Sequence, residues 1–150
     1  MRLQTNRLVI KNPDRNELQE LSQLLKEPLL LHASNLMLPT DGELRLAALR
    51  VLAQMNHLLI IKTSQVVGLI MLSPSYDRTG RRISHQYELG YVLVSSCWGK
   101  GLMPEALQAV LKVIPPTIKI LAECRTNNYR SQRVLQKCGF NKISEELWCY

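Results

Sequence analysis

Apolar and polar residues alternate at the start of the chain, and the spacing then becomes helical. Residues 7–11 alternate in this way, which predicts a short strand. Asn12 and Pro13 follow as an expected N-cap and first helical residue. Leucines then recur at helical spacing, at Leu18, Leu21, Leu24 and Leu25. We therefore expect an amphipathic helix that Pro28 ends.

A second helix and a hairpin are predicted next. Thr40 and Glu43 have the spacing of a capping box, and apolar residues continue at helical spacing as far as Met55. Residues 58–62 and 65–73 are rich in Ile, Val and Leu and are separated by two polar residues. This pattern indicates two antiparallel strands.

The second half of the chain alternates strands with helices. Its predicted elements are a polar loop at 73–82, a strand at 86–94, a helix at 104–113, a strand at 117–124, a helix at 130–138 and a last strand at 147–150. The order βααβββαβαβ favours one α/β (α+β) domain over residues 1–150, in which a mixed sheet carries helices on both faces.

Positive charge is concentrated in one stretch. The net charge is +7, and residues 112–142 hold seven cations against the single acidic residue Glu123. They are Lys112, Lys119, Arg125, Arg130, Arg133, Lys137 and Lys142. Such a patch favours a phosphorylated ligand, a nucleic acid or an anionic surface, and a solvated helix face is the plain alternative. Aromatic residues form only 5% of the chain, which argues against a nucleic-acid partner.

The cysteine spacing argues against a metal site, and the short apolar runs argue against a membrane protein. The four cysteines form no CxxC pair and have no histidine nearby in the sequence, so we expect no metal site. No apolar run approaches the length of a membrane span, and Arg2, Asn6, Arg7 and Lys11 interrupt the apolar stretch that a secretory peptide would need. We therefore expect a cytoplasmic protein that neither crosses nor binds a membrane.

A glycine turn is the sharpest local feature. A predicted strand ends near Val94, the turn contains Gly99 and Gly101, and a helix follows near Pro104. Glycines let the backbone approach a ligand, and the free N–H groups of a helix start attract a phosphate. Tight connections also use glycine for geometry alone. The turn matches neither the P-loop nor the dinucleotide motif, because it lacks GK[ST] and the third glycine.

Two tracts in combination indicate a family. The chain contains YELGYVLVSSCWGKGLMPEAL, followed by NNYRSQRVLQKCGF, in which Asn128 and Ser131 stand three residues apart. It resembles the GCN5-related N-acetyltransferases (GNAT), specifically the ribosomal-protein-alanine acetyltransferase-like branch. The opening TNRLVIK and the segment VVGLIML are also similar to strands of that branch. The resemblance implies a mostly antiparallel sheet, here shortened at the C-terminus.

The resemblance also implies the site. Its cofactor-binding positions correspond to Leu93, Val94, Trp98, Gly99, Lys100, Gly101, Leu102, Met103, Asn128 and Ser131. Leu93 matches the main-chain N–H donor to the thioester carbonyl, Glu88 the candidate base and Ser131 the serine beside the cofactor sulfur. His85 is the alternative base. Considered singly, Glu88 and Ser131 can also be structural, and Asn128 an ordinary N-cap.

The function implied is acetyl transfer from acetyl-CoA to a primary amine, such as a protein N-terminus, by direct attack. Two alternatives stay open at this point: an acyl-CoA-binding sensor without turnover, and a basic RNA-associated protein. Only ten residues follow Phe140, so the family's final hairpin is expected to be incomplete. A last strand without an outer partner would invite pairing with another chain, which suggests a homodimer.

Overall fold

A single mixed sheet runs through the molecule. The computed structural model describes residues 1–28, 30, 38–55 and 57–150. Within these, eight strands form one sheet in the order β1-β2-β3-β4-β5-β6-β8-β7. Among these described strands, only β5 and β6 are parallel neighbours, which confirms a mostly antiparallel sheet. The strands are β1 Arg2–Gln4, β2 Val9–Lys11, β3 His57–Lys62, β4 Val66–Tyr76, β5 Arg82–Leu93, β6 Lys119–Glu123, β7 Asn141–Lys142 and β8 Leu147–Cys149.

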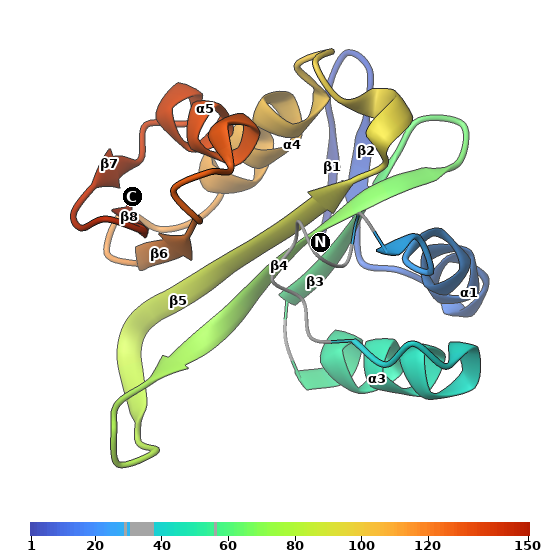
Figure 1. Cartoon of the computed structure of the whole chain (residues 1–150), viewed down its shortest axis with the longest axis horizontal. Coiled ribbons are helices and arrows are strands. Elements are labelled where there is room, and N and C mark those ends of the chain that lie inside the picture. Colours follow the sequence, from blue (N-terminus) through green and yellow to red (C-terminus); the bar gives the residue numbers. More distant parts are fainter. Residues whose placement is uncertain (29, 31–37, 56) are drawn as a thin grey trace.

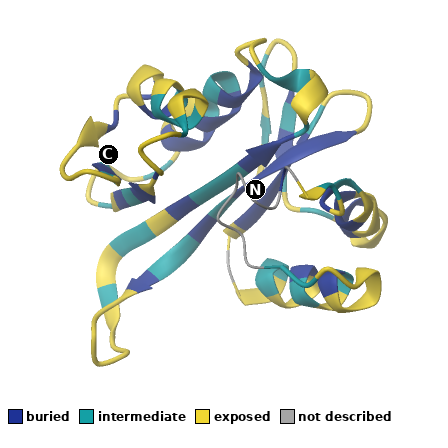
Figure 2. Ribbon diagram, in the orientation of Figure 1, coloured by how far each residue is buried: buried dark blue, intermediate teal, exposed yellow. Residues whose placement is uncertain are grey.

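Helices cover both faces of the sheet, as predicted. Two helices, α1 Arg15–Leu24 and α3 Gly42–Met55, lie on one face, and α4 Leu102–Leu111 and α5 Tyr129–Lys137 lie on the other (Figure 1). Each face has its own apolar core, and the buried stretches of β3, β4 and β5 lie between them (Figure 2). In the described part of the chain, no helix is long and apolar enough to span a membrane.

Aspartates rather than the predicted residues begin the first two helices. The Asp14 side chain accepts the Glu17 N–H at 2.9 Å, and the Glu17 carboxylate accepts the Asp14 N–H at 3.0 Å. This capping box replaces the predicted cap at Asn12. Asp41, not Thr40, accepts a backbone N–H from the third residue of α3. An aspartate carboxylate nearer the helix satisfied these N–H groups in both cases.

The strands flanking the predicted polar loop are longer than the sequence indicated. The loop expected at 73–82 is wrong in its bounds, because β4 and β5 include half of it and only residues 77–81 connect them. The Asp77 carboxylate closes this connection by accepting the backbone N–H groups of Thr79 and Arg81 at 2.8 and 3.0 Å. Strand β1, which is only three residues long, was missed for lack of a readable alternation.

The C-terminal hairpin is short, as expected, but it does contain two strands. Strand β8 lies between β6 and β7 and pairs with both of them in antiparallel register. Its outer neighbour β7 is only two residues long, Asn141–Lys142. The expectation that the last strand lacks an outer partner is therefore wrong, because two residues suffice to cover it. An exposed edge of the last strand therefore no longer supports a homodimer, and the homodimer stays a prediction.

An ion-pair cluster connects α1 to strands β2 and β3. The Glu17 carboxylate lies 2.7 Å from Lys11 Nζ and 2.8 Å from Lys62 Nζ. Burial raises the pKa of Glu17, but hydrogen bonds from Lys11, Lys62 and the Asp14 backbone outweigh it and lower the pKa to about 2. The carboxylate is thus charged throughout the physiological range and holds helix and strands together.

Candidate active site

A cleft opens where two parallel strands separate. Strands β5 and β6 pair only between Gln86 and Glu88 on one strand and between Lys119 and Leu121 on the other. Beyond these pairs β5 continues to Leu93 beside β4, while β6 continues beside β8. The cleft has a volume of about 990 Å³ and is lined by β4, β5, the glycine turn, the start of α4 and α5.

Leu93 presents its backbone to this cleft. In an antiparallel ladder alternate residues donate toward the same neighbour. The Val94 N–H donates to the Val67 carbonyl at 2.9 Å, so the Leu93 N–H, one residue earlier, points away from β4 and toward the gap beside β6. The Leu93 carbonyl is occupied, because the Trp98 indole donates to it at 2.6 Å. The N–H is therefore the group that Leu93 offers to a ligand.

Two glycines shape the turn before α4. Gly99 and Gly101 have φ values of 74° and 73°, in the left-handed region that L side chains rarely adopt. Gly101 caps α4 without any side chain, so the N–H groups of the first turn are left to another acceptor. Gly99, Gly101, Leu102 and Met103 all line the cleft. The strand, glycine turn and helix predicted here are therefore present, and the turn fits an anion.

Two predicted cofactor residues do not line the cleft. The Val94 N–H is used by Val67, as described above, and holds the end of β5 against β4. Lys100 turns its carbonyl away from the cleft, where it accepts a hydrogen bond from Arg7 Nη1 at 2.9 Å. Trp98, in contrast, lies at the cleft, and the Arg130 guanidinium stacks over its ring at 4.3 Å.

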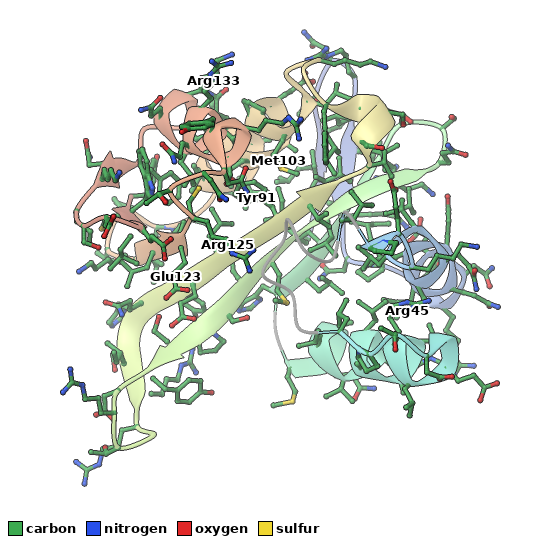
Figure 3. All side chains as sticks on the ribbon, in the orientation of Figure 1. Arg45, Tyr91, Met103, Glu123, Arg125 and Arg133 are labelled. Atoms are coloured by element: carbon green, nitrogen blue, oxygen red, sulfur yellow. The ribbon has the colours of Figure 1, made fainter. Side chains whose placement is uncertain are left out.

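Asn128 and Ser131 come together with a tyrosine. The Asn128 side chain accepts the Ser131 N–H at 3.2 Å, so it has the structural N-cap role. Tyr91 and Ser131 share a hydrogen bond of 2.6 Å between their hydroxyl groups. Burial raises the pKa of the Tyr91 phenol, which the bond to Ser131 only partly offsets, so the phenol stays neutral. Both side chains line the cleft, with Tyr91 near the C-terminal end of β5 (Figure 3).

The other end of the cleft carries polar side chains from β4, β5 and β6. Glu88 pairs with Ser73 across β4 and β5, so both side chains lie on the same face. Glu123 and Ser75 also line this end. Ser75 is 2% exposed, and its hydroxyl is the single fully buried side-chain polar atom without a hydrogen-bond partner in the described part of the chain. His85, the alternative base, is exposed and does not line the cleft.

Cations line the cleft beside the glycine turn. Arg130, Arg133 and Lys137 follow one another at helical spacing on α5, and all three line the cleft. This is the part of the basic stretch that the fold brings beside the α4 N-terminus. The combination of free backbone N–H groups, three cations and an apolar floor fits the phosphates and pantetheine arm of a coenzyme A thioester.

The sequence alone missed three residues at this site. Tyr91 belongs to the ELGYVL segment. Its spacing of two residues from Leu89 and Leu93 predicts only that these three side chains face the same side of the sheet. Gly68, within VVGLIML, packs against the end of β5, and Arg7 reaches the glycine turn from the N-terminus. An isolated glycine within a strand was the one available signal, because it suggests a close backbone approach.

Comparison with known proteins identifies the family. The family described as the acetyltransferase (GNAT) domain matches residues 7–141. The chain belongs to the GNAT acetyltransferase family. It is therefore an acetyl-CoA-dependent N-acetyltransferase. No curated protein sequence matches it closely enough to count as a relative.

Solved structures share the fold of this acetyltransferase at low identity. RimL, a ribosomal L7/L12 α-N-protein acetyltransferase in complex with coenzyme A, gives a TM-score of 0.80 at 18% identity over 100% of this chain and 97% of that one. The ribosomal-protein-S5-alanine acetyltransferase from Vibrio fischeri gives a TM-score of 0.78 at 17% identity, over 100% of this chain and 96% of that one. An acetyltransferase of the GNAT family from Bacillus anthracis gives a TM-score of 0.77 at 21% identity, over 99% of this chain and 94% of that one.

Proposed function

We propose that this acetyltransferase transfers the acetyl group of acetyl-CoA directly to a primary amine, and that the amine is a protein N-terminus. One observation carries the direct transfer: Leu93, Ser131 and Glu88 all line a single cleft. A donor, an acid and a base around one cavity are what thioester aminolysis requires.

Each of these residues acts in one step of the acetyl transfer. The amine nitrogen attacks the thioester carbon, and the Leu93 N–H stabilises the negative charge that develops on the carbonyl oxygen. The C–N bond forms and the C–S bond breaks. Glu88, directly or through water, takes the ammonium proton, while the Ser131 hydroxyl gives a proton to the departing thiolate and regains one from solvent. Positioning the two substrates in one cleft supplies much of the remaining rate.

Cofactor binding is assigned to the opposite end of the cleft. The backbone N–H groups at Gly99, Gly101, Leu102 and Met103 would hold the pyrophosphate, and Trp98 flanks it. The α5 cations add charge complementarity. Acetyl-CoA should raise the melting temperature far more than NAD or ATP does. Gly101→Ala should reduce this shift, whereas the control Gly80→Ala, at a positive φ in the 77–81 connection, should leave it unchanged.

The acceptor is assigned to the polar end. Glu88 and Glu123 favour a cationic group, and the unpartnered Ser75 hydroxyl favours a ligand that donates or accepts a hydrogen bond there. The backbone of a peptide supplies such groups next to its ammonium. Two of the fold neighbours named above act, by their names, on ribosomal proteins, which supports a protein N-terminus over a small amine.

An acceptor screen tests the proposal. Release of coenzyme A, followed with a thiol reagent, should be fastest with peptides that begin with Ala or Ser. The same peptides with a blocked N-terminus and an internal lysine are the matched control and should be inactive. Turnover of small amines or amino sugars alone would contradict the acceptor class. Binding of acetyl-CoA with no turnover of any amine would favour the sensor instead.

A further inference from the structure

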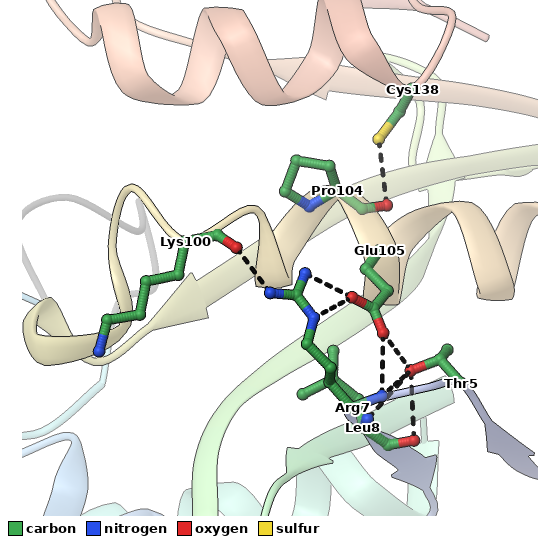
Figure 4. A network of polar contacts seen from close by, with 7 residues as sticks. All are labelled: Thr5, Arg7, Leu8, Lys100, Pro104, Glu105 and Cys138. Atoms are coloured by element: carbon green, nitrogen blue, oxygen red, sulfur yellow. Dashed lines mark hydrogen bonds and ion pairs between the residues drawn. The ribbon is translucent and has the colours of Figure 1, made fainter.

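Arg7 connects the N-terminal strands to the back of the glycine turn. Its Nε and Nη2 lie 2.7 and 2.5 Å from Glu105 Oε2, and its Nη1 donates to the Lys100 carbonyl at 2.9 Å (Figure 4). The other Glu105 oxygen accepts the Thr5 hydroxyl at 2.5 Å and the Arg7 N–H at 3.2 Å. One guanidinium therefore bridges the first turn of α4 and the loop that precedes it.

The contact with Lys100 fixes one peptide plane. A trans peptide directs its C=O and its N–H to opposite sides, and no described peptide bond is cis. Arg7 holds the Lys100 carbonyl on its own side of the turn, so the Gly101 N–H of the same peptide unit points to the other side. Gly101 lines the cleft and Arg7 does not. The arginine thus orients a backbone donor toward the cleft without entering it.

Glycine at the turn makes this contact necessary. Gly101 has a positive φ and no side chain to restrict it, so rotation of the Lys100–Gly101 peptide unit meets little local resistance. A Cβ at Gly101 would lie 3.7 Å from Arg7 Nη2, so the guanidinium is the side-chain group next to this glycine. The guanidinium also compensates the Glu105 carboxylate, which would otherwise place an unpaired negative charge beside a phosphate site.

We propose that Arg7 is a positioning residue for acetyl-CoA: it fixes the Lys100–Gly101 peptide so that the Gly101 N–H donates to the pyrophosphate. This inference rests on the proposed function, in which the glycine turn binds the pyrophosphate. Because Arg7 acts through the backbone, its loss affects only ligands that carry the pyrophosphate.

The test compares two thioesters in titrations and steady-state kinetics. Arg7→Ala should raise the Kd and KM for acetyl-CoA about tenfold or more, since one oriented donor to a charged group is lost, with kcat at saturation nearly unchanged. The KM for S-acetylpantetheine, which lacks the pyrophosphate, should not change. An equal rise for both thioesters, or no rise for acetyl-CoA, would overturn the inference.

Two further variants separate positioning from general damage. Arg7→Lys keeps the charge but cannot bridge the carboxylate and the carbonyl with a fixed fork, so its Kd should lie between those of the wild type and Arg7→Ala. Wild-type affinity of Arg7→Lys would overturn the orientation argument. Lys62→Ala, which breaks an ion pair with Glu17 instead, should lower the melting temperature but leave the Kd unchanged. Wild-type protein that fails to bind acetyl-CoA would overturn the proposed function itself.

Discussion

Gly68 lies directly opposite Leu93 in the β4–β5 pair, and no side chain fits between the two backbones. A Cβ at Gly68 would come within 2.3 Å of the Val92 carbonyl oxygen and within 3.1 Å of the Leu93 Cα. The atoms in the way belong mainly to the backbone and cannot move aside cheaply. The closeness of β4 therefore sets the position of the strand end that carries the Leu93 N–H.

Gly68→Ala should displace this strand end and slow catalysis. We expect kcat to fall roughly 10- to 100-fold, because misplacing an oxyanion donor by a fraction of an ångström removes most of its effect. Steady-state kinetics at saturating acetyl-CoA measure the change. Gly42→Ala is the control, because among the described residues a Cβ there meets only Arg45 Nη2, at an ordinary 3.8 Å. Equal kcat values for both variants would contradict the role of Gly68.

Glu88→Gln tests the base. If Glu88 accepts the amine proton, kcat should fall by about 10²- to 10⁴-fold and the acidic limb of its pH profile should disappear. The Kd for acetyl-CoA should change little, since Glu88 lies at the polar end of the cleft. Glu123→Gln, at the same end, should keep the acidic limb. A wild-type pH profile with near-normal kcat in Glu88→Gln would mean that solvent takes the proton.

Tyr91→Phe tests the hydroxyl pair. The 2.6 Å bond orients the Ser131 hydroxyl, so we expect kcat to fall several-fold to about tenfold. Because burial raises the pKa of Tyr91, the loss should be the same from pH 6 to 9. Tyr91→Phe should add nothing to Ser131→Ala, since the two act as one unit. Tyr87→Phe, whose hydroxyl contacts Arg82, serves as control. Additive losses would show that Tyr91 acts independently of Ser131.

Acid stability should depend on Glu17. Its folded-state pKa of about 2 lies below the ordinary 4.5, so its stabilisation is complete above pH 5 and is lost as the pH falls toward 2. The shift corresponds to about 3 kcal/mol. Urea unfolding between pH 7 and 2.5 should show Glu17→Gln less stable than wild type at neutral pH, with the difference shrinking in acid. The exposed Glu145→Gln should follow the wild-type curve, and a constant difference for Glu17→Gln would contradict the assignment.

Local patterns predicted most of the elements. The strand before the glycine turn, the helix after it and the N-cap at Asn128 depend on neighbours within a few residues, and all are present. Element ends were predicted less well. Both Asn12 and Asp14 are good caps by type, and only the reciprocal bonds with Glu17 decide between them. The length of β4 likewise depends on pairing with β5, which overrides the polar character of residues 73–76.

The sequence by itself determined the family, because the glycine turn and the Asn128–Ser131 spacing are short-range features. The tertiary structure alone decided which groups meet. Arg7 and Glu105 are 98 residues apart, Tyr91 and Ser131 are 40 apart, and Gly68 is 25 from Leu93. Such contacts arise from strand register and the divergence of β5 from β6. Those in turn depend on packing across the whole sheet, which no local pattern encodes.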